Sequence, residues 1–170
     1  MTPEPTARRA VLGDEREIAR LRILMINDLW GPPNPGPWDD AAVAGIRAWL
    51  IEPATAATAT AATTTAVFVV DAPDGPGLAA SVIGAIEELL PSERNPTGRL
   101  GYVYGVATDT RHRRRGYSRL AMTALLDWYT ERGISRVDLH ASEFGDALYR
   151  ELGFEDSHGT ALTWHNPKLG

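Results

Sequence analysis

Five arginines crowd into a short stretch of an otherwise acidic chain. Between Arg111 and Arg119 there are five arginines and no aspartate or glutamate, whereas the whole chain of 170 residues carries a formal net charge of −5. A concentrated basic patch on an acidic protein favours a small polyanionic ligand over a long polyanion such as nucleic acid. The stretch therefore predicts a binding site for the phosphate groups of a small molecule.

The same stretch leads into a predicted helix over residues 116–132, whose start favours bound anions. The first turn of a helix has backbone N–H groups without intrahelical partners, and the helix dipole adds positive potential there. Gly116 lets the backbone approach a ligand without a Cβ atom in the way, and the small Ser118 leaves the same face open. The guanidinium groups that can chelate phosphate oxygens belong to Arg113, Arg114, Arg115 and Arg119. A solvated basic loop before an ordinary helix is the alternative.

The hydrophobic pattern predicts helices and strands on both sides of this stretch. Apolar residues at helical spacing predict helices, and short β-branched runs bounded by Gly and Pro predict strands. The predicted helices cover residues 14–30, 39–50, 116–132 and 144–152, and the predicted strands cover residues 67–70, 79–89, 100–108, 136–140 and 159–165. Residues 53–65 are almost entirely Ala and Thr, which indicates a flexible or helical connector. This order predicts a mixed α/β or α+β sheet with helices on its faces.

Length and composition narrow the class of protein. The chain is 44% apolar and 23% charged, and 170 residues suit one domain, which we expect over residues 1–170. No run approaches the ~20 apolar residues of a membrane helix, and residues 1–22 contain no secretory hydrophobic region. The absence of cysteine excludes disulfides, a thiol nucleophile and thiolate metal sites, and it fits a cytoplasmic protein. We expect no membrane or nucleic-acid partner.

Two motifs in this order resemble a known family. Residues 113–118, Arg-Arg-Arg-Gly-Tyr-Ser, resemble the (Gln/Arg)-x-x-Gly-x-(Gly/Ala) signature of the GNAT superfamily of acetyl-CoA-dependent N-acetyltransferases. Residues 146–154 resemble its Leu-Tyr-x-x-x-Gly-Phe segment. The resemblance implies a GNAT-type α/β (α+β) fold, with a mixed, mostly antiparallel sheet of about six to seven strands and about four helices. It also implies acetyl-CoA as co-substrate, whose pyrophosphate and 3′-phosphate suit the basic loop, and no metal.

The resemblance assigns residues to the donor site. The pantetheine arm is expected to pair with the strand that precedes the signature, and the phosphates are expected to lie on the signature loop. The implied cofactor-binding residues are Val106, Ala107, Thr108, Arg113, Arg114, Arg115, Gly116, Tyr117, Ser118, Arg119 and Ser142. Three positions depart from the family pattern: Ser118 replaces Gly or Ala, Thr110 replaces a frequent Pro, and Ser142 replaces a frequent Asn. His112, inside the loop, is expected to touch coenzyme A or solvent.

The resemblance also implies direct transfer from the thioester to a bound amine. Tyr149 matches the family's tyrosine that protonates the leaving thiolate, and the alternative is an aromatic residue that only packs. Glu87 and Glu88 stand where several members keep a catalytic carboxylate. Adjacent strand residues face opposite ways, so only one of the two can point into the cleft, and His140 is the next candidate for the base.

The acceptor is predicted to be a small-molecule amine, and the resemblance implies that the first helices and the loop between them bind it. The candidate substrate-binding residues are Met25, Asp28, Trp30, Trp38 and His140. Aromatic rings beside a carboxylate suit a cationic amine. Transfer to a protein or peptide amine, O-acetylation, and a non-catalytic acyl-CoA-binding regulatory module stay open as alternatives. A homodimer also stays open.

Overall fold

A five-stranded sheet with helices on both faces organises the first of two units in the computed structural model. This unit is Met1–His140, and the second is Ala141–Gly170. The structure describes residues 4–32, 38–51, 63–158 and 161–166. Within these residues, none of the helices combines the length and the apolar character that crossing a membrane requires.

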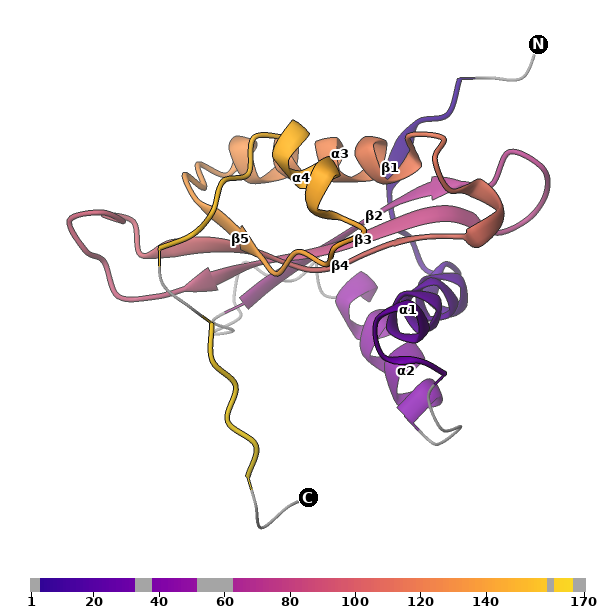
Figure 1. Ribbon diagram of the computed structural model, residues 1–170, viewed down its shortest axis with the longest axis horizontal. Coiled ribbons are helices and arrows are strands. Elements are labelled where there is room, and N and C mark those ends of the chain that lie inside the picture. Colours follow the sequence, from indigo (N-terminus) through magenta and orange to yellow (C-terminus); the bar gives the residue numbers. More distant parts are fainter. Residues whose placement is uncertain (1–3, 33–37, 52–62, 159–160, 167–170) are drawn as a thin grey trace. The chain divides into compact units, whose positions relative to one another are not determined.

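The strands follow one another across the sheet in sequence order (Figure 1). They are β1 (Ala7–Arg9), β2 (Thr63–Asp71), β3 (Leu78–Glu88), β4 (Arg99–Thr108) and β5 (Val137–Leu139). β1 to β4 pair antiparallel, and the short β5 pairs parallel to β4. The parallel pairing is possible because a helix connects these two strands and crosses over the sheet.

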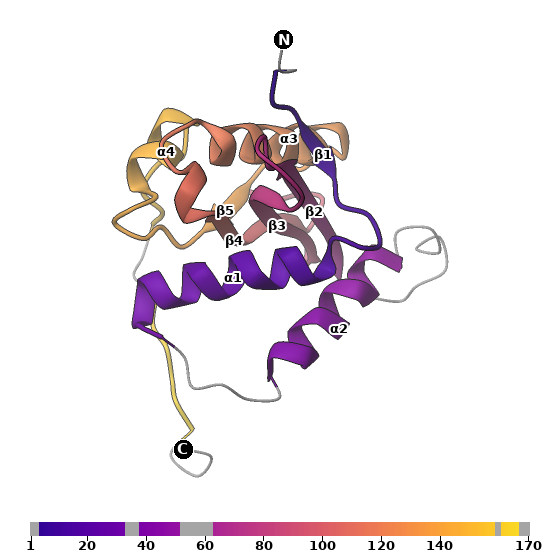
Figure 2. The same ribbon diagram turned by 90° about the vertical axis from the view of Figure 1, so that its right-hand side faces the viewer.

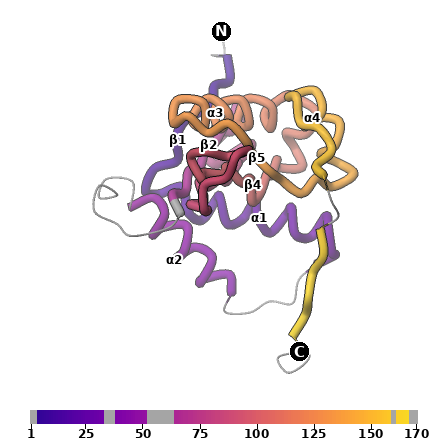
Figure 3. Tube along the Cα trace, turned by 90° about the vertical axis from the view of Figure 1, so that its left-hand side faces the viewer, coloured from indigo at the N-terminus to yellow at the C-terminus, as the bar shows by residue number. Residues whose placement is uncertain are grey.

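Helices cover both faces of the sheet. The helices of the first unit are α1 (Glu15–Trp30), α2 (Trp38–Ile51) and α3 (Tyr117–Glu131). Figures 2 and 3 show α1 and α2 on one face and α3 on the other. Since both faces are covered, every residue of β3 from Leu78 to Ile86 is buried, and only the last two residues of the strand reach the surface. On the α1 side, Ile18 and Leu21 pack against alternate sheet residues such as Val67.

The fold class predicted from the sequence is confirmed, with five strands in place of six to seven. The helix predicted over residues 14–30 and the strand over 100–108 match α1 and β4 within a residue. β2 starts four residues before the predicted strand, because Thr63, Thr64 and Thr65 pair with β3 and do not belong to a flexible or helical connector. The rest of that connector, residues 53–62, lies outside the described residues. The three-residue β1 was not predicted.

The last predicted strand, over residues 159–165, is wrong in its described part. Residues 161–166 form neither a strand nor a helix, and residues 159–160 lie outside the described residues. Leu162 and Trp164 alternate with polar residues as a strand would, but both side chains are almost fully exposed. Alternation produces a strand only where a partner strand supplies hydrogen bonds, and the described residues offer none here.

Candidate active site

A bulge in β4 marks the part of the sheet where a ligand can pair with the backbone. Ile83 pairs with Gly105, but the next residue of β3 pairs with Val103, so Tyr104 is an extra residue without a partner. β5 pairs only with residues 101–103 of β4. From Tyr104 to Thr108 the outer edge of β4 therefore has no strand partner among the described residues. Unpaired edge N–H and C=O groups are the groups that an extended ligand uses to add itself to a sheet.

The chain leaves this edge through a loop shaped for an anion. Arg114 has a φ of 63° and Gly116 has a φ of 82°, both in the left-handed region. Gly116 is the residue that precedes α3, and no side chain in the described part of the chain caps the helix start. Backbone turned in this way directs successive N–H groups into one concavity, and the first turn of α3 adds its own unpaired N–H groups. The loop predicted from the sequence to bind phosphate thus has a suitable backbone geometry.

The arginines of this loop differ in how they are held. The Arg113 guanidinium lies 2.6 Å from the carboxylate of Asp28 and donates from Nε to the carbonyl oxygen of Thr108 at 3.4 Å. The exposed side chains of Arg114 and Arg115 form no hydrogen bond or ion pair within the described part of the chain. The guanidinium groups of Arg114 and Arg115 are therefore available to phosphate, whereas Asp28 of α1 already neutralises that of Arg113.

A hydroxyl pair joins the end of β4 to the first turn of α3. The side chains of Thr108 and Ser118 are hydrogen-bonded to each other. In this arrangement the Ser118 hydroxyl does not crowd the anion site, because it is turned toward the sheet. Of the other predicted strand contacts, the Ala107 side chain is buried in the core under α1, which leaves only its backbone for a ligand.

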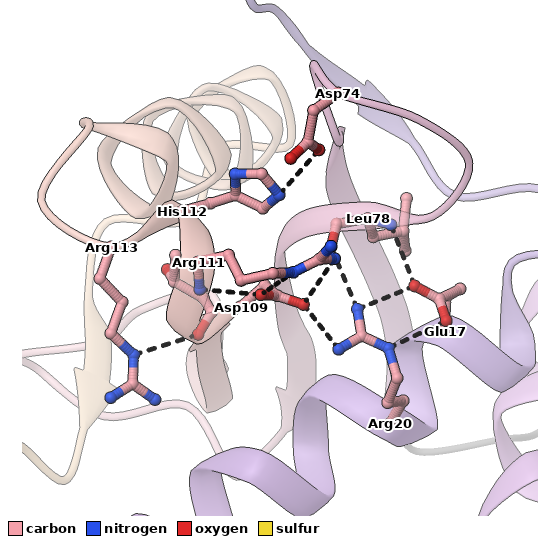
Figure 4. Close-up of polar contacts among 9 residues, drawn as sticks. Glu17, Arg20, Asp74, Leu78, Asp109, Arg111, His112 and Arg113 are labelled. Carbon is pink, nitrogen blue, oxygen red and sulfur yellow. Dashed lines mark hydrogen bonds and ion pairs between the residues drawn. The ribbon is translucent and has the colours of Figure 1, made fainter.

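The carboxylate of Asp109 fixes the start of the loop through ion pairs and a backbone hydrogen bond (Figure 4). Its carboxylate lies 2.7 Å from the Arg20 guanidinium and 3.1 Å from that of Arg111, and it accepts the backbone N–H of Arg111 at 2.9 Å. Burial opposes ionisation of this nearly inaccessible side chain. The hydrogen bonds from Arg111 and Arg20 outweigh burial and hold the pKa of Asp109 well below its ordinary range. Arg20 is in turn fixed by Glu17, whose carboxylate lies 2.8 Å away.

This anchor was missed in the sequence. An Asp directly after a strand and two residues before an Arg is the spacing of a local capping turn, which was a usable signal for Asp109. No local pattern could reveal Arg20, which is 89 positions away.

His112 faces the interior, contrary to the expectation that it touches coenzyme A or solvent. It is 1% exposed, and its ring meets that of Tyr117 edge-on at 6.0 Å between centroids. Its Nε2 atom lies 3.2 Å from a carboxylate oxygen of Asp74, although neither ring nitrogen forms a well-aligned hydrogen bond within the described residues. Tyr117, a predicted cofactor contact, is likewise buried and presents its backbone at the helix start.

The two adjacent carboxylates of β3 face opposite sides of the sheet. A Cβ atom on Gly101 would meet Tyr129 of α3, so the next residue, Tyr102, faces the α1 side. Glu87 lies on that same side, where it accepts a hydrogen bond of 2.9 Å from the Tyr104 hydroxyl. Glu88 lies on the α3 side, 3.9 Å from Arg99. Only Glu87 therefore shares a surface with the bulge of β4.

Two tyrosines and a histidine complete the surface around Glu87. The rings of Tyr102 and Tyr104 lie 4.9 Å apart, and the Tyr102 hydroxyl is hydrogen-bonded to Nδ1 of His140. Burial raises the pKa of both phenols. The next cause is the negative charge of Glu87 for Tyr102 and the hydrogen bond to Glu87 for Tyr104. Both phenols are therefore protonated near neutral pH. These tyrosines were not singled out in the sequence, although their alternation beside Gly101 and Gly105 was visible.

The predicted acceptor residues of the first helices are dispersed. The Met25 sulfur lies 3.7 Å from the position that a Cβ atom would take on Gly105, at the bulge. Asp28 is occupied by Arg113. Trp30 is 78% exposed at the end of α1, and Trp38 is half-buried at the start of α2. Part of the proline-rich turn between them, residues 33–37, lies outside the described residues. The structure thus brings Met25, but not Trp30, to the unpaired part of β4.

The second unit carries Tyr149 on a short helix, α4 (Asp146–Glu151). The Tyr149 ring is half-buried against Phe154, with 6.0 Å between centroids. It also lies so close to Gly145 that a Cβ atom there would stand 2.6 Å from the ring. Burial raises the pKa of the Tyr149 phenol. The carbonyl of Ser142 accepts the N–H groups of Gly145 and Asp146 and so starts the turn into α4.

The described residues contain no group of three or more His, Asp or Glu side chains that could hold a metal ion.

Comparison with known proteins shows the family and the fold. The profile of the acetyltransferase (GNAT) family matches residues 23–154, which include β2 to β5, the loop and α4. A search of curated proteins found no match.

Solved structures of acetyltransferases superpose over nearly the whole chain. A predicted acetyltransferase from Clostridium acetobutylicum, solved with acetyl-CoA, has a TM-score of 0.76 at 20% identity, covering 94% of this chain and 96% of its own. A GCN5-related N-acetyltransferase from Ralstonia eutropha JMP134 has a TM-score of 0.70 at 21% identity, covering 95% and 99%. Glucosamine-6-phosphate N-acetyltransferase from Arabidopsis thaliana has a TM-score of 0.67 at 14% identity, covering 96% and 100%. At these identities the likeness establishes the fold.

Proposed function

Since the chain belongs to the acetyltransferase (GNAT) family, we propose that it transfers an acetyl group from acetyl-CoA to the amine of a small molecule. The observation that carries this proposal is the unpaired edge of β4, residues 104–108, which runs into the loop and α3 start at Gly116. Five extended residues span about 16 Å, enough for an arm with two amide groups to pair with the strand. The pyrophosphate then reaches the N–H groups and guanidinium groups of the loop.

The residues present fit this donor. The space around Gly116 is open: among the described residues, no atom from another part of the chain lies within 4 Å of the position that a Cβ atom would take. Arg114 and Arg115 are exposed beside it. The Clostridium acetobutylicum structure was solved with acetyl-CoA, which supports the choice of this donor.

The chemistry of the transfer assigns a task to each candidate residue. Acetyl-CoA supplies an activated thioester carbon; the amine nitrogen attacks it, and the C–S bond breaks. Glu87 is the proposed base that takes the proton of the amine, directly or through water, because an ammonium group has no lone pair for attack. An unpaired N–H on the edge of β4 is the proposed hydrogen-bond donor to the thioester carbonyl. Tyr149 is the proposed donor of a proton to the departing thiolate, since its raised pKa keeps the phenol protonated.

We propose an amine of a small molecule as the acceptor, a choice that the names of two structural neighbours support. The Ralstonia eutropha and Arabidopsis thaliana proteins are named N-acetyltransferases, and the second acts on an amino sugar phosphate. Glu87, with the rings of Tyr102 and Tyr104, also forms a surface that suits an ammonium group before its deprotonation. Peptide acceptors, hydroxyl acceptors and binding without turnover are outcomes of the test below.

A ligand-binding measurement followed by an acceptor screen tests the proposal. Acetyl-CoA at about a hundred times its dissociation constant is expected to stabilise the fold by ~2.7 kcal/mol in thermal unfolding. Release of free CoA is then measured over small amines, peptides and alcohols. Small amines are expected to give the largest kcat/KM, and binding without any turnover would support the non-catalytic module.

A pair of glycines supplies the matched control for the binding site. Gly116→Trp is expected to abolish the acetyl-CoA shift, because the indole fills the space of the phosphates. Gly133, at the other end of α3, also has a positive φ, of 68°, and open space around it. Gly133→Trp therefore strains the same helix to a similar degree without touching the site, and it is expected to keep the shift. Equal shifts in wild type and Gly116→Trp would contradict the proposed donor site.

A further inference from the structure

Arg22 is a half-buried cation of α1 on the side of the helix that faces β4. Its Nη1 atom lies 3.8 Å from the position that a Cβ atom would take on Gly105. Within the part of the chain that the structure describes, its guanidinium forms no hydrogen bond or ion pair. By contrast, Arg20 on the same helix is paired with Glu17 and with Asp109. A guanidinium that no described carboxylate neutralises is free to bind an anionic group of a ligand.

The position of Arg22 separates it from the phosphates of the donor. Gly105 lies three residues before Thr108, at which the strand ends and the loop begins. Three extended residues correspond to about 10 Å, so the guanidinium lies at the bulge and away from the anion-binding loop. The donor phosphates therefore do not account for it.

The same surface carries the proposed base. Gly105 faces α1, since a Cβ atom on it would point toward the Met25 sulfur, and Glu87 lies on that face with its carboxylate held by the Tyr104 hydroxyl. Tyr104, which binds Glu87, is the extra residue of the bulge, and Gly105, which lies beside Arg22, follows it. The carboxylate of Glu87 and the guanidinium of Arg22 therefore lie on either side of the bulge of β4. A ligand that carries both charges would be oriented by this pair, with its amine toward Glu87 and its anionic group toward Arg22.

We propose that Arg22 binds an anionic group of the acceptor, so that the acceptor is an amine that also carries a carboxylate or a phosphate. This inference rests on the proposed function and names the substrate class of the same site. The guanidinium offers a planar pair of donors that matches either group. Removal of the charge weakens binding of an anionic acceptor and leaves a neutral acceptor unaffected.

Paired acceptors measure this difference. CoA release is compared for β-alanine and β-alanine amide, which differ in a carboxylate, and for phosphoethanolamine and ethanolamine, which differ in a phosphate. Wild type is expected to prefer the anionic member of at least one pair, and the preferred pair identifies the anionic group. Arg22→Gln is expected to lower kcat/KM for that anionic member roughly 10- to 100-fold, as loss of a charged hydrogen bond does, with the neutral member changed less than about threefold. Arg22→Lys is expected to recover part of the loss.

Arg16→Gln is the matched control, since Arg16 is exposed on the same helix. It is expected to behave as wild type with every acceptor. A wild type without preference for either anionic amine, or an equal loss for both members of a pair in Arg22→Gln, would overturn the proposal. A preference for succinyl-CoA over acetyl-CoA that disappears in Arg22→Gln would also overturn it, because Arg22 would then recognise the acyl group. A thermal shift with acetyl-CoA separates these results from failure of the proposed function, in which no shift occurs.

Discussion

The guanidinium of Arg113 lies 2.6 Å from the carboxylate of Asp28, so that α1 holds one arginine of the anion-binding loop before α3. The sequence pattern placed Arg113 in the donor site and Asp28 in the acceptor site. In the structure each neutralises the other, and both side chains are 41% exposed. An exposed pair of this kind contributes little to stability, so its main effect is on the charge that the loop presents to a ligand.

Asp28→Asn is expected to strengthen acetyl-CoA binding. The substitution removes one negative charge beside the loop and frees Arg113 to turn toward phosphate, which lowers the dissociation constant about two- to fivefold at low salt. The gain is expected to shrink as salt is raised. Isothermal titration with CoA at two ionic strengths measures both effects. Asp127→Asn, at an exposed position on α3, is the control for a change in net charge. Weaker binding in Asp28→Asn would show instead that Asp28 holds Arg113 in its binding position.

Asp109→Asn is expected to destabilise the fold by about 1–3 kcal/mol at neutral pH, since it removes the negative charge and one of the two carboxylate oxygens that Arg20 and Arg111 bind. The pKa of Asp109 is lowered in the folded state, so its ionised form stabilises the fold at every pH above the unfolded value of about 4. That contribution is lost as the pH falls below about 4 toward the folded pKa.

Urea unfolding from pH 8 to pH 3 measures this dependence. The difference in the free energy of unfolding between wild type and Asp109→Asn is expected to be constant above pH 5 and to shrink below pH 4. Asp71→Asn, which removes a 60% exposed partner of Arg8, is expected to cost no more than about 1 kcal/mol. A difference between wild type and Asp109→Asn that persists unchanged to pH 3 would show that the charge of Asp109 is not what stabilises the loop.

Local pattern was sufficient for the elements that carry the donor site. The spacing of Ile18, Leu21 and Met25 predicted α1, because a helix needs only its own sequence period and a core to pack against. The anion-binding loop could be predicted for a similar reason, because Gly116 and the arginines around it lie within a few residues of each other. β1 was missed because three residues are too few to show a period.

Contacts between distant segments could not be predicted. The pairing of Arg20 with Asp109 and of Arg113 with Asp28 depends on where α1 crosses β4, and no single-sequence pattern encodes that crossing. The choice between Glu87 and Glu88 required the register of β3 with β4, because a shift of one residue exchanges their faces.

Glu87→Gln and Glu88→Gln form a matched pair on adjacent residues of one strand. Glu87 shares a face with the bulge of β4 and is the proposed base, so its substitution is expected to lower kcat/KM for the amine roughly 100- to 1000-fold. Glu88 lies on the other face beside Arg99, and its substitution is expected to change kcat/KM less than about twofold. Steady-state kinetics with the best acceptor, together with thermal unfolding of both variants, separates catalysis from stability. Equal effects of the two substitutions would exclude a specific role for Glu87.

Tyr149→Phe is expected to lower kcat about 10- to 100-fold without changing the affinity for CoA, because it removes the proposed proton donor and keeps the ring that packs on Phe154. Burial raises the pKa of the Tyr149 phenol, so the hydroxyl stays protonated up to its raised pKa, and the proton is lost only as the pH rises through that value. Wild-type kcat is therefore expected to show no loss from this group below about pH 10.

Gly145→Ala gives a second test of Tyr149. The added Cβ atom would stand 2.6 Å from the Tyr149 ring and displace it, so kcat is expected to fall while the hydroxyl is still present. If kcat of Tyr149→Phe equals that of wild type, the Tyr149 side chain only packs and water protonates the thiolate.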